Sequence, residues 1–471
     1  MKKVLIFIAA AVLGIAMLSC AKEQVRNADS ADPDEKTEAG KIAKVFTAGF
    51  ERTRGDIESG NLRWAVNDKV AVYDDVNPST ANEFTVTEVN GLNVTFNGTV
   101  SVGATSFKAV YPFAAASENL AGDLLSVVIP SSQEIPSGKT VDPSAIVSVA
   151  ATTTSSFSFK NVFSLAKFTI TQDNVSEVRF DAAVGECSPS AATGILSEAG
   201  TFAHVTVTPA GGGNFAAGTY YAAVVPCTRS GMVVCSKVGD VFRWKHDDST
   251  TGVEFPRNGG IDFQNVDTGN ILLAKWRFTK ELKTDFEAAW RDTTTASGYG
   301  KRDGIYANEA GLARIRFRSA GSTSQTRGIA SATGFPQVNS VQKNDRWVFF
   351  ITPSANIASG SKIHIKFYTN ISSSGDKTWR RAINNGSAWR YFDSDGNPTL
   401  SDTSSDVLVT TPTDGSYTLI EGTITLAEGL TAGTEKEFFR LFKSGGDTGY
   451  TRLCDNASDG FDIGPYIEIV P

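Results

Sequence analysis

For a chain of 471 residues, this sequence is poor in the residue types that most often carry enzymatic chemistry. It holds 3 histidines and 5 cysteines, and charged residues make up only 20% of it. No HExxH, GxSxG or P-loop pattern occurs, which argues against the common zinc, hydrolase and nucleotide sites. The loop Gly211-Gly212-Gly213 lacks the remaining glycine of GxGxxG. We therefore expect a protein that is not an enzyme and that has no cofactor and no metal site.

The sequence also lacks a basic stripe and a recognisable cysteine framework. Its formal net charge is −7, whereas nucleic-acid binding domains concentrate positive charge on one face, so no nucleic-acid partner is expected. The cysteines beyond Cys20 form no CxxC pair, and we expect buried thiols, with disulfide pairing left open. These cysteines are Cys187, Cys227, Cys235 and Cys454.

What the chain does contain is typical of an all-β protein. It has 43 glycines and 10% aromatic residues, and phenylalanine, threonine, serine and valine recur in short runs between turn residues. The length suggests about three domains. We therefore expect tandem β-sandwiches.

The first twenty residues have the form of an export signal. Met1-Lys2-Lys3 is followed by an apolar run from Val4 to Leu18, which is shorter than a membrane span. The ending Met17-Leu18-Ser19-Cys20 resembles the lipobox of bacterial lipoproteins, which implies cleavage before Cys20 and acylation of its sulfur. An ordinary cleaved signal is the alternative. Residues 21–40 are too polar to bury a core, and we expect them to form a flexible tether.

Short β-prone runs begin at residue 41 and carry ordered landmarks. They start with Phe46-Thr47-Ala48-Gly49-Phe50 and with Trp64-Ala65-Val66, which is followed by Val70-Ala71-Val72-Tyr73. Asn90-Gly91 predicts a hairpin. The later landmarks are Ala109-Val110-Tyr111-Pro112-Phe113, Ile129-Pro130-Ser131-Ser132-Gln133, the run Phe157 to Ile170, and Tyr220-Tyr221-Ala222-Ala223-Val224-Val225-Pro226.

In this order the landmarks resemble the fimbrillin-like surface lipoproteins of Bacteroidetes over residues 41–268. The resemblance implies two consecutive transthyretin-like sandwiches, at 41–155 and 156–268. In pilins of this kind a trypsin-like protease cuts after an arginine just past the first strand, and another subunit's strand then fills the groove. Arg52 and Arg54 match that position in kind. A solvated basic turn is the alternative interpretation of these two arginines.

Residues 270–471 form the third expected unit. The strand pattern resumes at Ile271 after a boundary near Asp267-Thr268-Gly269-Asn270, and one short helix is possible around Leu282 to Trp290. Ile363 and Ile365 alternate with polar residues, as in a half-buried strand. Such strands predict a jelly-roll-like sandwich, which over 271–471 is similar to jelly-roll carbohydrate-binding modules.

One segment of this unit is the candidate ligand-binding site. Trp faces stack on sugar rings, and arginine guanidinium groups donate paired hydrogen bonds. Such residues bracket the turn Asn384-Asn385-Gly386 and make a binding platform possible; alternatively, the tryptophans are core residues. They are Trp379, Arg380, Arg381, Trp389, Arg390 and Tyr391. A stripe of like charges at Arg314, Arg316 and Arg318 adds to the case for an anionic or polar ligand.

Acidic residues of the terminal unit receive simpler interpretations. Asp393-Ser394-Asp395-Gly396-Asn397 lacks the pattern of an EF-hand loop and predicts a hairpin turn. A structural calcium site at Asp455, Asp459 and Asp462 is left open. Glutamates in candidate strands are expected on the wet face of the sandwich rather than in a catalytic pair. They are Glu421, Glu437 and Glu468.

Together these expectations describe a lipoprotein of the outer membrane, anchored through Cys20 and facing the cell exterior. Its C-terminal sandwich would act in adhesion or glycan binding, with a glycan or a host or bacterial surface protein as partner. The alternative is a structural or tip subunit of a fimbria that assembles with other subunits by protease-activated strand exchange.

Overall fold

The computed structural model describes residues 36–275, except 39, 51–63, 92, 199, 230–232 and 247–251. Beyond residue 275 it describes 311–318, 330–331, 336–339, 346–371, 378–384, 389–392, 398–399, 409–410, 418–443, 450–454 and 466–471, with side chains mainly at 349–366, 425–437 and 466–471. In these segments the fold is a set of β-sheets joined by turns and three short 3-10 helices. The expected all-β fold of several sandwiches is confirmed.

The first sheet has eight strands in the order β1-β2-β11-β10-β6-β3-β4-β5, and a further pairing of β2 with β5 closes it. Its strands are β1 (Lys36–Glu38), β2 (Lys41–Phe50), β3 (Lys69–Asp74), β4 (Asn82–Asn90), β5 (Asn93–Ser101), β6 (Phe107–Tyr111), β10 (Ser148–Thr152) and β11 (Ser156–Asn161). Phenylalanines fill the interior because alternate positions of every strand point inward. Those with at most 4% of their surface exposed are Phe46, Phe84, Phe96, Phe107, Phe157 and Phe159.

Two local expectations in this sheet have different outcomes. The predicted hairpin at Asn90-Gly91 is confirmed: Asn90 lies opposite Asn93, and Gly91 has a φ of +63°. The strand expected at Trp64-Ala65-Val66 is wrong, because this segment is a turn in which the Asp68 carboxylate accepts a hydrogen bond from the Ala65 N–H at 2.8 Å. Trp64 is buried and packs on Tyr111, with ring centroids 4.3 Å apart.

The second unit packs a small sheet against part of a large one. The small sheet contains β16 (Gly218–Val224), β12 (Ser164–Ile170) and β21 (Gly260–Asn265). The large sheet contributes β13 (Val175–Pro189), β15 (Thr201–Pro209), β18 (Val233–Val238) and β19 (Val241–His246), with β14 (Leu196–Glu198) beside β13. β17 (Cys227–Arg229) and β20 (Val253–Phe255) form a separate pair. Phe168 of the small sheet and Phe180 of the large sheet belong to one hydrophobic cluster.

The first two units are interleaved rather than strung one after the other. β7 (Ala116–Asn119), β8 (Leu125–Ile129) and β9 (Ser132–Ile135) precede β10 of the first sheet, yet β8 pairs with β13 and β9 with β15 of the large sheet. The 3-10 helices η1 (Phe113–Ala115) and η2 (Pro143–Ala145) lie at the connections. β11 pairs with β2, so the chain leaves the first sheet after Asn161. One hydrophobic cluster holds residues of both units, which therefore share a core.

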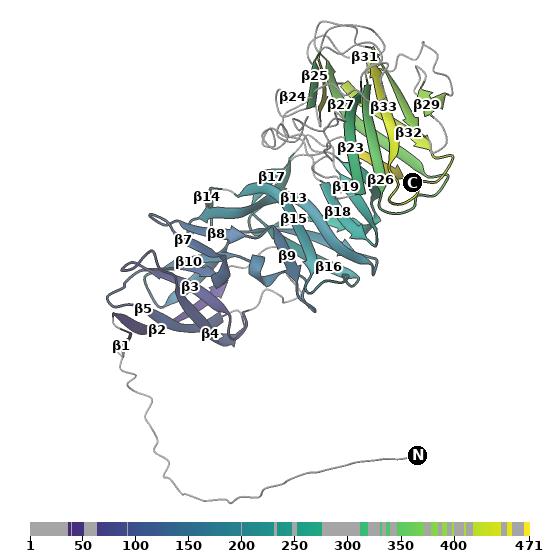
Figure 1. Ribbon diagram of the computed structural model, residues 1–471. Coiled ribbons are helices and arrows are strands. Elements are labelled where there is room, and N and C mark those ends of the chain that lie inside the picture. Colours follow the sequence, from purple (N-terminus) through teal and green to yellow (C-terminus); the bar gives the residue numbers. More distant parts are fainter. Residues whose placement is uncertain are drawn as a thin grey trace, which may run out of the picture.

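The large sheet continues without a break into the terminal unit. After η3 (Val266–Thr268), β22 (Asn270–Lys275) pairs with β19 on one edge and with β35 (Tyr466–Val470) on the other. The sheet extends through β27 (Lys362–Ile371) to β34 (Tyr450–Cys454), β25 (Pro336–Asn339) and β24 (Ala330–Ser331), with β32 (Thr418–Thr425) beside β27. Figure 1 shows this run of strands from the middle of the molecule to its upper end.

A second sheet completes the terminal sandwich, in the order β23-β26-β33-β28-β29-β30 with β31 beside β28. Its strands are β23 (Gly311–Arg318), β26 (Arg346–Pro353), β33 (Lys436–Lys443), β28 (Thr378–Asn384), β29 (Trp389–Phe392), β30 (Pro398–Thr399) and β31 (Val409–Thr410). Ile363 and Ile365 are buried, which confirms their predicted alternation with polar residues. The helix predicted near Leu282 lies outside the described residues.

Candidate functional sites

The predicted hairpin of the terminal unit is present in the backbone. β28 contains Trp379, Arg380 and Arg381, and β29 contains Trp389, Arg390 and Tyr391. The two strands are antiparallel, and β29 is followed by the short strand β30 at the edge of the sheet. The side chains of all six residues lie outside the described residues, so their role in binding stays a prediction.

The register of this hairpin separates the two tryptophan positions. Asn384 lies opposite Trp389 and Ala382 lies opposite Tyr391. Opposed positions in an antiparallel pair share a face, and positions alternate along each strand. Trp379 is five residues from Asn384, an odd number, so its position lies on the opposite face of the strand. The position of Trp389 is therefore grouped with those of Arg380 and Tyr391, and that of Trp379 with those of Arg381 and Arg390.

The first long strand, β2, occupies the position that strand exchange would require. It pairs with β5 from Lys41 to Gly49 and with β11 from Thr47 to Phe50. The ring of Phe46 is fully buried among four other aromatic rings, with centroid distances of 4.8–5.9 Å. Arg52 and Arg54 follow this strand directly and lie outside the described residues.

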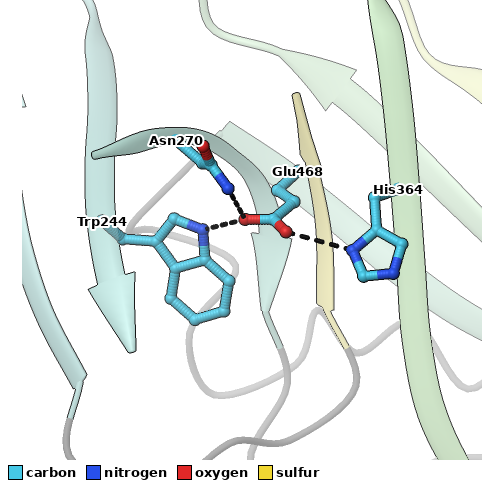
Figure 2. A network of polar contacts seen from close by, with 4 residues as sticks. All are labelled: Trp244, Asn270, His364 and Glu468. Atoms are coloured by element: carbon cyan, nitrogen blue, oxygen red, sulfur yellow. Dashed lines mark hydrogen bonds and ion pairs between the residues drawn. The ribbon is translucent and has the colours of Figure 1, made fainter. Parts of the chain in front are cut away.

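A third site was missed in the sequence. Glu468 of β35 was expected on a wet strand face, and this expectation is wrong: only 3% of its surface is exposed. Its Oε2 accepts hydrogen bonds from Trp244 Nε1 at 2.7 Å and from Asn270 Nδ2 at 3.0 Å. Its Oε1 lies 3.0 Å from His364 Nδ1. Figure 2 shows the carboxylate between these three partners, which come from β19, β22 and β27.

The surroundings of Glu468 favour its charged form. Burial by itself would raise the pKa of this carboxyl group, but the hydrogen bonds from His364, Asn270 and Trp244 and the nearby His246 lower it by more, so the pKa lies below its ordinary value. Trp244 is 1% exposed, and its ring lies 4.5 Å from that of His246 and 4.7 Å from that of Tyr466. The arrangement is an anionic centre held at the join between the second unit and the terminal unit.

This site left only a faint signal in the sequence. Glu468 interrupts the apolar strand Tyr466 to Val470, and histidine is rare in the chain. A charged residue in the middle of such a strand can mark a buried, satisfied carboxylate, but its partners are 104–224 residues away in the chain. Local patterns do not reveal partners at that separation.

The other predicted features are the cysteines and the acidic residues of the terminal unit. Cys187 and Cys227 are free thiols, and Cys187 and Cys235 are buried, as expected for scattered buried cysteines. Burial raises the pKa of the Cys187 thiol to about 12. Cys20, the turn at Asp393–Asn397 and the acidic residues Asp455, Asp459 and Asp462 lie outside the described residues, as does the side chain of Cys454.

Two further results concern metals and membranes. Among the residues that the structure describes, no three His, Cys, Asp or Glu side chains gather as metal ligands. The described part of the chain also contains no helix that is both long and apolar enough to cross a membrane.

Comparison with known proteins gives likenesses among solved structures only. No family model and no curated protein matches the chain. It is similar to a protein from Bacteroides ovatus assigned to cell adhesion, with 11% identity and a TM-score of 0.30 over 48% of this chain and 92% of that one. The tip fimbrial protein Mfa3 from Porphyromonas gingivalis shares 10% sequence identity with it, with a TM-score of 0.26 over 48% of this chain and 94% of that one. SGBP-B from a complex xyloglucan utilization locus in Bacteroides uniformis shares 9% sequence identity, with a TM-score of 0.19 over 86% of this chain and 92% of that one.

Proposed function

We propose that this protein is a lipid-anchored protein of the outer-membrane surface that acts in adhesion or glycan binding through its terminal sandwich. The observation that carries the proposal is the register of the β28–β29 hairpin, which groups the positions of Trp389, Tyr391 and Arg380 on one face beside an edge strand. Arginine and aromatic residues are enriched where proteins contact partners. The absence of a recognisable catalytic motif from the sequence favours binding over catalysis.

The register narrows the proposed platform to one set of positions. Trp389, Tyr391 and Arg380 have the same parity and would contact the ligand together. Trp379 belongs to the other set and would pack inside the sandwich. This assignment replaces a platform made of both tryptophans, because a flat ligand contacts only one face of a two-stranded hairpin.

The test compares two tryptophan variants of residues 21–471, which is the expected mature chain without its acylated Cys20. Trp389→Ala should weaken binding on a glycan array by about 2 kcal/mol or more, which is roughly 30-fold, because a stacking aromatic is lost. Its melting temperature should stay near that of wild type. Trp379→Ala is the matched control and should lose about 3–5 kcal/mol of stability as a core residue. If Trp389→Ala melts far below wild type, Trp389 is a core residue and the proposed platform is not on this face.

The proposed anchor is tested separately. Acylation through a thioether requires a sulfur atom, so Cys20→Ser should yield unprocessed or released protein that takes up no labelled fatty acid. Several acyl chains, at about 0.8 kcal/mol per buried methylene, hold a protein on a membrane stably. Label on the Cys20→Ser protein would show that the chain is acylated elsewhere.

The second candidate function is a structural or tip subunit of a fimbria, assembled by strand exchange. The position of β2 favours it, because this strand is paired along both edges and inserts Phe46 into the core. Cleavage after Arg52 or Arg54 would separate β2 from the chain, and another subunit's strand could then restore the missing hydrogen bonds.

A further inference from the structure

The three histidines of the chain lie on one face of the large sheet. In an antiparallel pair opposed residues share a face, and residues i and i+2 of a strand do so too. The registers connect His204 with Asp181, Arg179 with Cys235, Cys235 with Trp244, Val233 with His246, Trp244 with Asn270, Leu272 with Glu468, and Glu468 with His364. This face, which we call the histidine face, runs from β15 to β27 across the join between the second and terminal units.

Two of these histidines contact carboxylates that are buried. His204 Nδ1 lies 2.7 Å from Asp181 Oδ1, and His364 Nδ1 lies 3.0 Å from Glu468 Oε1. Asp181 and Glu468 are each 3% exposed. His246 stacks on Trp244, which itself donates a hydrogen bond to Glu468. A buried carboxylate is costly unless its charge is offset, and a protonated imidazole can offset it.

Other ionisable groups face the same positions and bear on the balance of charge. Beside Glu468 and His364 these include Tyr466 and Lys366 on the histidine face, together with His246. On the adjacent strand β32, the position of Glu421 lies opposite Lys366. Beside Asp181, the Arg179 guanidinium contacts the Glu177 carboxylate, so these two charges offset each other. The arginine also lies over the Phe242 ring at 5.5 Å.

We propose that the histidine face is a pH-responsive seam, in which protonation of His364 strengthens the contacts that Glu468 makes across the join. Glu468 is already ionised near neutral pH, because its pKa is lowered. A charged imidazole adds an ion pair to the contact between His364 and Glu468, which holds the carboxylate in place as the acceptor for Trp244 and Asn270. Histidine suits this role because it is the side chain whose charge changes near neutral pH.

Two opposite losses define the pH window of the seam. The contribution of a protonated His364 beside an anion is present at mildly acidic pH and is lost as the pH rises and the imidazole loses its proton. The contribution of Glu468, whose pKa is lowered in the folded protein, is present above the ordinary pKa of a glutamate and is lost as the pH falls through the lowered value. The seam should therefore be strongest between these limits.

The first test is a titration of the imidazoles by NMR in the full mature chain. Because the chain has 3 histidines, single substitutions to glutamine assign every signal. His364 should lose its proton at a lower pH in Glu468→Gln than in wild type. Asp181→Asn is the matched control, because it removes the other buried carboxylate of the histidine face, and it should leave the His364 titration unchanged. An unchanged His364 titration in Glu468→Gln would overturn the proposal.

The second test measures the seam itself by hydrogen exchange of the amides in β22 and β35. Relative to wild type at the same pH, His364→Gln should exchange about tenfold faster at pH 6 and by a smaller factor at pH 8, because local opening reports the lost contact. This variant keeps Glu468 and its bonds to Trp244 and Asn270, so it should fold even if Glu468→Gln does not. An equal ratio at the two pH values would show a structural contact without pH dependence and would also overturn the proposal.

Discussion

Phe46→Ala should destabilise the closed sheet of the first unit by about 3–5 kcal/mol, since the substitution removes a buried ring and leaves a cavity. Phe46 has none of its surface exposed and lies within 5.5 Å of the rings of Phe84, Phe107 and Phe157, measured between centroids. β2 is hydrogen-bonded to β5 and β11, so we expect the surrounding strands to relax only partly around the cavity. Urea unfolding followed by fluorescence measures the change.

The adjacent residue supplies the control. Val45 lies on the same strand but is 52% exposed, so Val45→Ala should change the free energy of unfolding by less than about 0.5 kcal/mol. If both variants lose the same free energy of unfolding, the aromatic cluster around Phe46 does not stabilise β2, and β2 is held mainly by its backbone hydrogen bonds.

Proteolytic removal of β2 should have a still larger effect. An arginine-specific protease that cuts after Arg52 or Arg54 would leave β5 and β11 without their shared neighbour and would expose the ring cluster around Phe46. We expect the cut chain to lose the cooperative unfolding of its first unit once the released segment dissociates. A synthetic peptide spanning residues 36–50 should restore it, because the peptide can reform both ladders.

Two comparisons make this prediction decisive. The double variant Arg52→Gln, Arg54→Gln should resist the protease and unfold as wild type does. N-terminal sequencing of surface protein shows whether the cut occurs in cells: chains that begin only at acylated Cys20 would exclude the fimbrial route and leave a tethered receptor. A cut chain that unfolds like the intact one would show that β2 is not needed for the first unit.

Local features of the fold could be predicted from sequence because their causes are local. The Asn90-Gly91 turn fixes its own hairpin, since Gly91 adopts the positive φ that the turn needs. The alternation of Ile363 and Ile365 with polar residues identified a strand with one buried face. Glu468 was likewise expected in a strand, and it lies in β35.

The partners of these strands could not be predicted in the same way. Phe157 and Phe159 belong to the core of the first sheet through the pairing of β11 with β2, although the sequence placed them in the second unit. Similarly, β8 (Leu125–Ile129) precedes the last strands of the first sheet in the chain but pairs with β13 of the large sheet. Which strand pairs with which depends on the strand edges that come together in the folded protein, and the local sequence does not encode this. Glu468 shows the consequence for function, because nothing in its own segment indicates Trp244 or His364.

The unbroken sheet at β22 has a mechanical consequence. The strand β1 falls within residues 21–40, which were expected to be a flexible tether throughout, and it pairs with β2. Figure 1 places β1 and β29, which belongs to the candidate platform, at opposite ends of the molecule. If the proposed anchor and ligand site are both present, a pull on the ligand would be transmitted through the hydrogen-bond ladders on the two edges of β22 rather than through a flexible linker. The terminal sandwich would therefore follow the orientation of the second unit. Excising residues 270–471 would cut through this load path, which is why binding is best measured on the whole mature chain.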